Sequence, residues 1–147
     1  MNGLEKSVRA MKEIEGMLED FRRARIVYLT TFSDGEEKSR QMTNLNDDPY
    51  KMMWFPTYRE TKKVRDIEEN PRVLVTFPSS REDEYYEIEG RAEFESDEIT
   101  VEKWQWWYLY WHPGQKNRFW FPGGTNYPDR LIINVYPQSV RVVRKSR

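Results

Sequence analysis

The sequence predicts a mainly β domain with inserted helices, built as a small closed or split β-barrel. About seven segments alternate apolar and polar residues or carry β-branched and aromatic runs, and helical patterns lie between them. The clearest strand covers residues 86–94, where every second residue is apolar or small. The motifs GxGxxG and GxxxxGK(S/T) do not occur, which argues against Rossmann and P-loop folds.

Length and charge limit the number of domains and the class of partner. A chain of 147 residues suits one domain, with residues 1–22 as an N-terminal helix and residues 23–147 as the barrel. The chain carries 24 basic and 25 acidic residues, so its net charge is −1. This balance provides no global attraction to nucleic acids or anionic membranes, and the 15% aromatic content argues against disorder.

The sequence lacks the residues that several kinds of functional site require. The sequence contains no cysteine, which removes disulfides, zinc-thiolate sites and cysteine nucleophiles. His112 is the single histidine, so multi-histidine metal sites within one subunit and Ser-His chemistry are not expected. No apolar run is long enough to cross a membrane, and residues 4–21 are too charged for a signal peptide. We therefore predict a cytoplasmic protein without metal.

An amphipathic helix and a β-hairpin are predicted at the start of the chain. The apolar residues of the helix recur at helical spacing; they are Leu4, Val8, Met11, Leu18 and Phe21. We expect this helix to pack on the barrel as a lid or plug. Residues 26–32 are β-rich, and a Ser-Asp-Gly-Glu turn at 33–36 leads into a second strand at 38–45.

The second strand of the hairpin carries a candidate phosphate ligand. Its alternation sends Arg40 and Met42 to one face and Gln41 and Thr43 to the other. If Arg40 faces the helix that follows in the chain, its planar guanidinium can hold a phosphate bidentately, which a lysine cannot. The alternative is a surface salt bridge with one of the many glutamates.

Residues 54–71 join the end of a strand, a hydroxyl-rich turn and a basic helix. Residues 52–55 are predicted to form a buried strand whose hydrogen-bond ladder ends at Pro56. The helix is expected to have its first turn near residues 57–61 and to stop before Asn70-Pro71, because the residue before proline is pushed out of the helical region.

This predicted first turn is a candidate anion site. Unpaired backbone N–H groups and the positive end of the helix dipole favour an anion there, and Lys62 and Lys63 add full positive charges. The alternative is an ordinary capping box formed by Thr57 and Glu60, with both lysines solvated. The local sequence leaves both interpretations open.

Further strands are predicted at residues 73–77, 86–94, 131–135 and 140–143. Gly90 indicates a bend where a barrel wall curves. The glutamates that alternate with the apolar residues of 86–94 indicate a solvated face rather than a catalytic carboxylate array, since the period-2 spacing needs no other explanation.

A helix rich in aromatic residues is predicted at 97–111, with Ser96 or Asp97 as its cap. Its aromatic face consists of Trp104, Trp107, Tyr108 and Trp111. Such a helix must be buried on two sides, and a dimer interface would bury it. Nucleic-acid stacking is the alternative, because Lys103, Lys116 and Arg118 lie among the aromatic residues.

The order and spacing of these segments resemble the FMN-binding split barrels related to pyridoxamine 5'-phosphate oxidase, and most closely their small general-stress-protein branch. The core pattern is matched by Phe55, Thr57, Lys63, Asn70 and Pro71, with Thr61 where a serine is usual. Three more segments match in order, at residues 40–42, 88–92 and 111–124. The resemblance covers residues 23–137, and its specificity lies in the order of the motifs.

The resemblance implies a flavin site. In the family the arginine of this strand contacts the flavin phosphate, and the residues after it border the ring. The implied phosphate ligands are Arg40, Thr57, Thr61, Lys62 and Lys63. The implied ring neighbours are Gln41, Met42, Thr43, Phe55 and Pro56, with Trp111 or Trp120 of the other subunit covering the ring.

The resemblance also implies a function. It predicts a homodimer that binds FMN and acts as a flavin-dependent oxidoreductase on an unknown substrate, with a small-molecule electron donor or acceptor. The alternatives are a non-catalytic, stress-associated flavin protein and a deazaflavin (F420)-dependent reductase. The flavin supplies the electron chemistry, so we name no catalytic residue. Pyridoxamine phosphate oxidation itself is not expected, because no basic and histidine substrate set is identifiable near the end of the chain.

Overall fold

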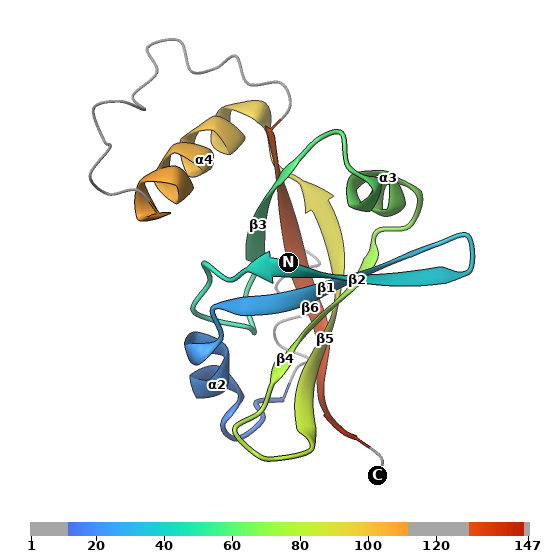
Figure 1. Ribbon diagram of the computed structural model, residues 1–147, viewed down its shortest axis with the longest axis vertical. Coiled ribbons are helices and arrows are strands. Elements are labelled where there is room, and N and C mark those ends of the chain that lie inside the picture. Colours follow the sequence, from blue (N-terminus) through green and yellow to red (C-terminus); the bar gives the residue numbers. More distant parts are fainter. Residues whose placement is uncertain (1–11, 112–129, 146–147) are drawn as a thin grey trace.

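The computed structural model describes residues 12–111 and 130–145, with the backbone alone described over residues 105–111. The described strands form one antiparallel sheet in the order β2-β1-β4-β5-β6-β3, which curls into half of a split barrel (Figure 1). The elements are α2 (Met17–Arg23), β1 (Ile26–Ser33), β2 (Glu36–Thr43), β3 (Met53–Tyr58), α3 (Lys62–Glu69), β4 (Arg72–Pro78), β5 (Glu84–Phe94), α4 (Asp97–Trp111) and β6 (Arg130–Arg144). The predicted mainly β split barrel is confirmed.

The β1–β2 hairpin forms where the sequence predicts it. Asp34 and Gly35 connect the strands with φ angles of 53° and 76°. Two consecutive residues with positive φ make the turn whose twist matches that of the flanking strands, and Asp-Gly is a preferred pair for it. The hairpin thereby holds Arg40 opposite Leu29.

The structure differs from the prediction at the end of the chain. The two strands predicted at 131–135 and 140–143 are one strand, β6, so the described residues form six strands rather than seven. The pairing of β6 with β5 shifts register between Glu89 and Gly90, and the strand continues across this bulge. A Cβ atom on Gly90 would lie 2.8 Å from Val135 Cγ1, so the crossing strands need a glycine at the predicted bend.

The strand that contains Pro56 is longer than predicted. Pro56 does not end the ladder, because β3 continues to Tyr58 and pairs with β6 throughout. β3 is the last strand of the sheet. A proline is tolerated on such an edge strand, because its nitrogen can face away from the neighbouring strand.

The core lies on the inner face of the curled sheet. Its apolar residues come from alternate positions of the strands, as in β4, where Val73, Val75 and Phe77 are buried. Helix α2 adds Met17 and Phe21, which are both fully buried. The predicted packing of an N-terminal helix on the barrel is therefore seen for α2.

The described part of the predicted N-terminal helix is shorter than expected. Residues 12–16 are not helical, and Gly16 has a φ of 84° immediately before α2. This left-handed conformation interrupts a helix, and glycine adopts it without steric cost. Leu4, Val8 and Met11 lie outside the described residues.

Helices α3 and α4 lie near one end of the sheet, and α2 lies toward the other (Figure 1). Helix α3 begins at Lys62 rather than near residues 57–61, and it stops before Asn70-Pro71 as predicted. The backbone of α4 has the predicted bounds, and the Ser96 hydroxyl accepts a hydrogen bond from the Ile99 N–H. None of the described helices is both long and apolar enough to cross a membrane.

Candidate functional site

A cavity of about 300 Å³ lies between the two edge strands of the sheet, β2 and β3. These strands are the most distant pair in the strand order, and the curl of the sheet brings them together. Asn46, between them in the chain, accepts a hydrogen bond from the Trp54 N–H and donates one to the Trp54 carbonyl. Its side chain thus ties the connecting loop to the edge of β3.

The cavity is lined by residues from four elements: Arg40, Gln41, Met42, Thr43, Pro56, Thr57, Tyr58, Lys63 and Trp104. The strands contribute seven of these, and α3 and α4 contribute one each. The set includes two cations and no acidic residue. Its chemistry therefore suits an anionic group beside apolar and aromatic surface.

The N-terminus of α3 faces the same region as the cavity. Thr61 is the N-cap residue but makes no side-chain cap hydrogen bond, because its hydroxyl donates to the Tyr58 carbonyl at 2.9 Å. The first turn of α3 contains no acidic residue. The positive end of the helix is therefore not neutralised by its own first turn, which leaves it suited to an anion.

Lys63 projects from this first turn into the cavity. Its Nζ donates to the buried Thr57 Oγ1 at 2.7 Å. Burial lowers the pKa of Lys63, and the nearby positive charge of Arg40 lowers it further. The capping box, which was the alternative interpretation of this segment, does not form, because Thr57 lies in β3 and its hydroxyl accepts a hydrogen bond from Lys63.

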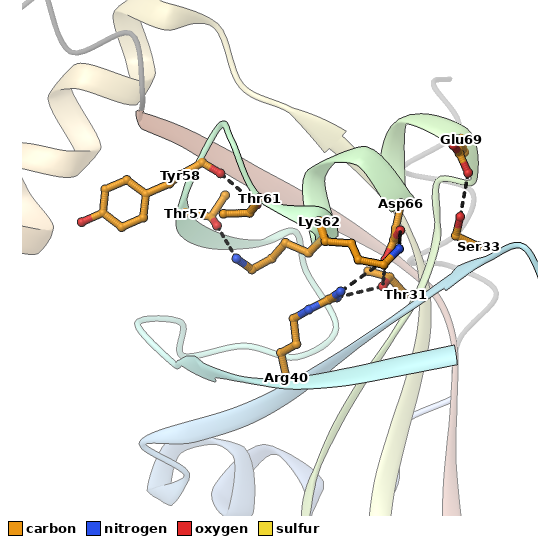
Figure 2. A network of polar contacts seen from close by, with 10 residues as sticks. Thr31, Ser33, Arg40, Thr57, Tyr58, Thr61, Lys62, Asp66 and Glu69 are labelled. Atoms are coloured by element: carbon orange, nitrogen blue, oxygen red, sulfur yellow. Dashed lines mark hydrogen bonds and ion pairs between the residues drawn. The ribbon is translucent and has the colours of Figure 1, made fainter. Parts of the chain in front are cut away.

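Arg40 reaches α3 from β2, as the sequence analysis required for a phosphate ligand. Its guanidinium donates to Thr31 Oγ1 at 2.9 Å and to Asp66 Oδ2 at 3.2 Å. Lys62 donates to the other oxygen of Asp66 at 3.0 Å, so the two cations converge on one buried carboxylate (Figure 2). The alternative of a salt bridge is therefore also realised, although the partner is a buried aspartate and not a surface glutamate.

Asp66 is ionised in this network. Burial raises its pKa, but hydrogen bonds from Lys62, Thr31 and Arg40 lower it more, so the pKa of Asp66 lies below its usual range. The carboxylate fixes one edge of the Arg40 guanidinium. A guanidinium has five N–H donors, and the described contacts use two of them.

The structure brings seven of the twelve predicted site residues together at the cavity: Arg40, Gln41, Met42, Thr43, Pro56, Thr57 and Lys63. Three others do not line it. Phe55 points into the core and is fully buried, because neighbouring residues of a strand face opposite sides. Thr61 and Lys62 lie beside the cavity, bonded to Tyr58 and Asp66. The Trp111 side chain and Trp120 lie outside the described residues.

Four residues of the site were not predicted: Thr31, Tyr58, Asp66 and Trp104. Asp66 follows Lys62 by four residues, a spacing that favours an ion pair on a helix and could have revealed it. Trp104 is buried, its Nε1 donates to the Leu131 carbonyl at 3.1 Å, and its ring centroid lies 5.3 Å from that of Tyr58. No sequence signal places this pair at the cavity, because the contact depends on how α4 packs.

The site can bind and orient an anion but offers little acid or base chemistry of its own. No histidine or carboxylate is among the described residues that line the cavity. Among the described residues, no group of three or more His, Asp or Glu side chains could hold a metal ion. Lys63 lines the cavity and has a lowered pKa. The geometry therefore fits binding of an anionic ligand better than acid–base or metal-dependent catalysis by the protein.

Comparison with known proteins supports the split-barrel fold described above. General stress protein 26 of Bacillus subtilis (strain 168) is 29% identical over 119 residues, covering 78% of this chain and 76% of the relative. A structure described as an F420 reductase has a TM-score of 0.60 at 22% identity, covering 88% of this chain and 98% of that one.

Another similar structure is a pyridoxamine 5'-phosphate oxidase-related, FMN-binding protein from Nostoc punctiforme. Its TM-score is 0.61 at 16% identity, covering 86% of this chain and 79% of that one. The family model described as pyridoxamine 5'-phosphate oxidase like matches residues 9–146, nearly the whole sequence. The chain therefore belongs to the pyridoxamine 5'-phosphate oxidase-like family.

Proposed function

We propose that this protein binds FMN in the cavity between β2 and β3. The observation that carries the proposal is the convergence of Arg40, Thr57 and Lys63 on one cavity beside the N-terminus of α3. Two cations, a hydroxyl and unpaired backbone N–H groups form a donor set for a phosphate. A phosphate monoester attached to an apolar ring suits the combination of this cationic end with Met42 and Pro56.

The residues divide into a phosphate end and a ring end. Arg40, Thr57 and Lys63 would hold the phosphate, with Thr61 and Lys62 at its rim. Gln41, Met42, Thr43 and Pro56 would border the ring, with the backbone of Phe55 between them. When bound, the flavin would supply the electron chemistry, while the chain binds and orients it.

A homodimer is part of this proposal. The cavity, at about 300 Å³, is at the small end of ligand sites and lies at open sheet edges, so a second subunit would enclose the ring further. The aromatic residues of α4 and of the segment after it, including Trp111 and Trp120, would contribute to that enclosure. Sedimentation at micromolar concentration should give about twice the chain mass; a monomer would contradict the dimer and leave the cavity proposal in place.

We propose flavin-dependent oxidoreduction of a small molecule as the activity. The alternatives are a non-catalytic flavin protein, in keeping with the similarity to a general stress protein, and a deazaflavin reductase, in keeping with the similarity to an F420 reductase. Reduction of the bound flavin by a nicotinamide donor, followed at the flavin absorption band, would separate turnover from simple binding. The cytoplasmic location stays a prediction.

The decisive experiment is a titration of the purified protein with FMN, riboflavin and F420, followed by absorption and fluorescence. We expect saturable binding of FMN with a changed flavin spectrum, and weaker binding of riboflavin because it lacks the phosphate. Tight binding of F420 with none of FMN would replace the cofactor. Absence of binding by all three would overturn the proposal.

A further inference from the structure

Lys62 and Lys63 are neighbours in the sequence but have different environments. The Lys62 Nζ lies 3.0 Å from the Asp66 carboxylate, and its side chain is 48% exposed. Lys63 has a hydroxyl as its hydrogen-bonded partner, at Thr57 Oγ1, and shares the cavity with Arg40. Lys62 thus has an acid as its partner, whereas no acid lies among the described residues that line the cavity with Lys63.

Three features of the fold disfavour a proton on Lys63. The amine is partly buried, it belongs to the first turn of α3, and Arg40 adds a positive charge nearby. The positive end of a helix repels a cation in its first turn. In keeping with these contacts, burial first and Arg40 second lower the pKa of Lys63. A larger share of this amine than of an exposed lysine is therefore neutral and nucleophilic near neutral pH.

Arg40 supplies a docking point for a phosphate beside this amine. Thr31 and Asp66 hold the guanidinium in place from one side, and the contacts described for it leave three N–H donors for a ligand. Both Arg40 and Lys63 line the same cavity. An electrophile that carries a phosphate would thus be held next to the nucleophile.

We propose that Lys63 is a site of N-acylation by acyl phosphates. The Lys63 nitrogen attacks the acyl carbon, a carbon–nitrogen bond forms, and the carbon–oxygen bond to the phosphate breaks. The phosphate leaves with the electron pair and takes up the proton that the amine loses. The products are an amide at Lys63 and inorganic phosphate, and no oxidant or reductant takes part.

Acylation would also regulate the site. It replaces the cation of Lys63 by a neutral amide, which removes a charge-assisted partner of the phosphate. The expectation that acylation of Lys63 and binding of FMN exclude each other rests on the proposed function. The expectation that Lys63 reacts with acyl phosphates in the flavin-free protein does not. The two can therefore fail separately.

The test is competitive labelling of the flavin-free protein, mapped by peptide mass spectrometry. Trace acetic anhydride, which carries no phosphate, measures the nucleophilicity of each lysine alone. Acetyl phosphate measures that nucleophilicity together with any binding of its phosphate. We expect Lys63 to react with the anhydride at least about threefold faster than Lys62 or the exposed Lys51, because more of it is neutral. With acetyl phosphate, the rate of Lys63 relative to Lys62 or Lys51 should be at least about threefold higher than it is with the anhydride. Equal rates for the three lysines would overturn the proposal.

Two controls isolate the phosphate contact. Millimolar inorganic phosphate should slow acetyl phosphate labelling of Lys63 but leave its labelling by the anhydride unchanged. Arg40→Gln should remove the extra preference for acetyl phosphate. If the variant does not fold, the phosphate competition in the wild-type protein decides.

Two outcomes would contradict parts of the proposal. If the preference for Lys63 over the other lysines is the same with both reagents and does not change with inorganic phosphate, acyl phosphates are not the preferred reagents. Failure of FMN to protect Lys63, with the labelling otherwise as expected, would contradict the proposed function alone.

Discussion

The outer face of the sheet and the cluster of Arg40, Lys62, Lys63 and Asp66 at the start of α3 both carry acidic and basic side chains, but in different proportions. On the outer face two glutamates of β5 are paired with arginines: Glu89 lies 2.8 Å from Arg72, and Glu87 pairs with Arg141. At the start of α3, by contrast, Arg40 and Lys62 share one carboxylate, that of Asp66, and Lys63 has no ion pair among the described residues.

The two regions also differ in how exposed some of their charged side chains are. The side chains of Arg72 and Glu89 are 51% and 39% exposed, whereas that of Asp66 is 4% exposed. The outer face also has a larger hollow, of about 630 Å³, whose charged lining residues are Arg72, Arg141, Glu37, Glu87 and Glu89. The acids of this hollow outnumber its arginines, so its charge does not favour an anion, whereas at the start of α3 the cations outnumber the buried carboxylate and an anion would be favoured. The charge of the lining residues, rather than the size of the hollow, therefore favours the cavity beside α3 as the candidate site for an anion.

The largest expected effect is on stability. Asp66→Ala should lower the free energy of unfolding by about 2 to 3 kcal/mol, because it removes the partner of buried or partly buried donors. The matched change on the outer face, Glu89→Ala, should cost about 0.5 kcal/mol or less. Urea denaturation of both variants measures the difference. Equal losses would mean that the two regions do not differ energetically.

The next effect concerns ligand affinity. Arg40→Ala and Lys63→Ala should each weaken FMN binding by roughly tenfold or more, since each removes a charge-assisted hydrogen bond worth about 1.5 to 3 kcal/mol. Riboflavin should bind both variants as it binds the wild type, because it has no phosphate. The outer-face control Arg72→Ala should leave both affinities unchanged. Equal losses for FMN and riboflavin in a folded variant would remove that residue from the phosphate site.

A third prediction uses pH to separate the regions. Because the pKa of Asp66 is lowered in the folded state, its contribution to stability is present above the pKa of an unfolded aspartate and is lost as the pH falls through the folded value. The wild type should therefore exceed Asp66→Asn in unfolding free energy at pH 6, and the difference should shrink below about pH 4. Glu89→Gln should show a small difference at both pH values. A gap for Asp66→Asn that does not change with pH would contradict the network.

The smallest effect has the opposite sign. A lowered pKa means that folding disfavours the charged amine of Lys63. This cost is present at neutral pH, decreases as the pH rises above the folded pKa, and is gone above the pKa of an unfolded lysine. Lys63→Met should therefore raise the free energy of unfolding at pH 7 by about 0.5 kcal/mol or more, while it weakens FMN binding. Urea denaturation at pH 7 without flavin checks this. A destabilised variant would show that the Thr57 hydrogen bond outweighs the cost of burying the charge.

Much of the local structure could be predicted because it depends on near neighbours in the chain. The Asp34-Gly35 turn follows from the positive φ that the hairpin needs, and the end of α3 follows from Asn70-Pro71. The helix at 97–111 also has its predicted bounds. The prediction failed at Pro56, since whether proline ends a strand depends on its place in the sheet.

The sequence by itself determined the mainly β class, the hairpin and the alternating pattern of β5, and it named the cationic and hydroxyl residues proposed for the site. The predicted solvated face of glutamates holds only in part, since the side chain of Glu93 is 57% exposed but that of Glu87 is 11% exposed. Only the tertiary structure decided that β2 and β3, at opposite edges of the sheet, share a cavity. It also decided that Asp66 binds Arg40 and that Trp104 reaches Tyr58. The physical reason is that alternation and turn residues act over a few positions, whereas the meeting of two edges depends on the twist accumulated over every strand between them.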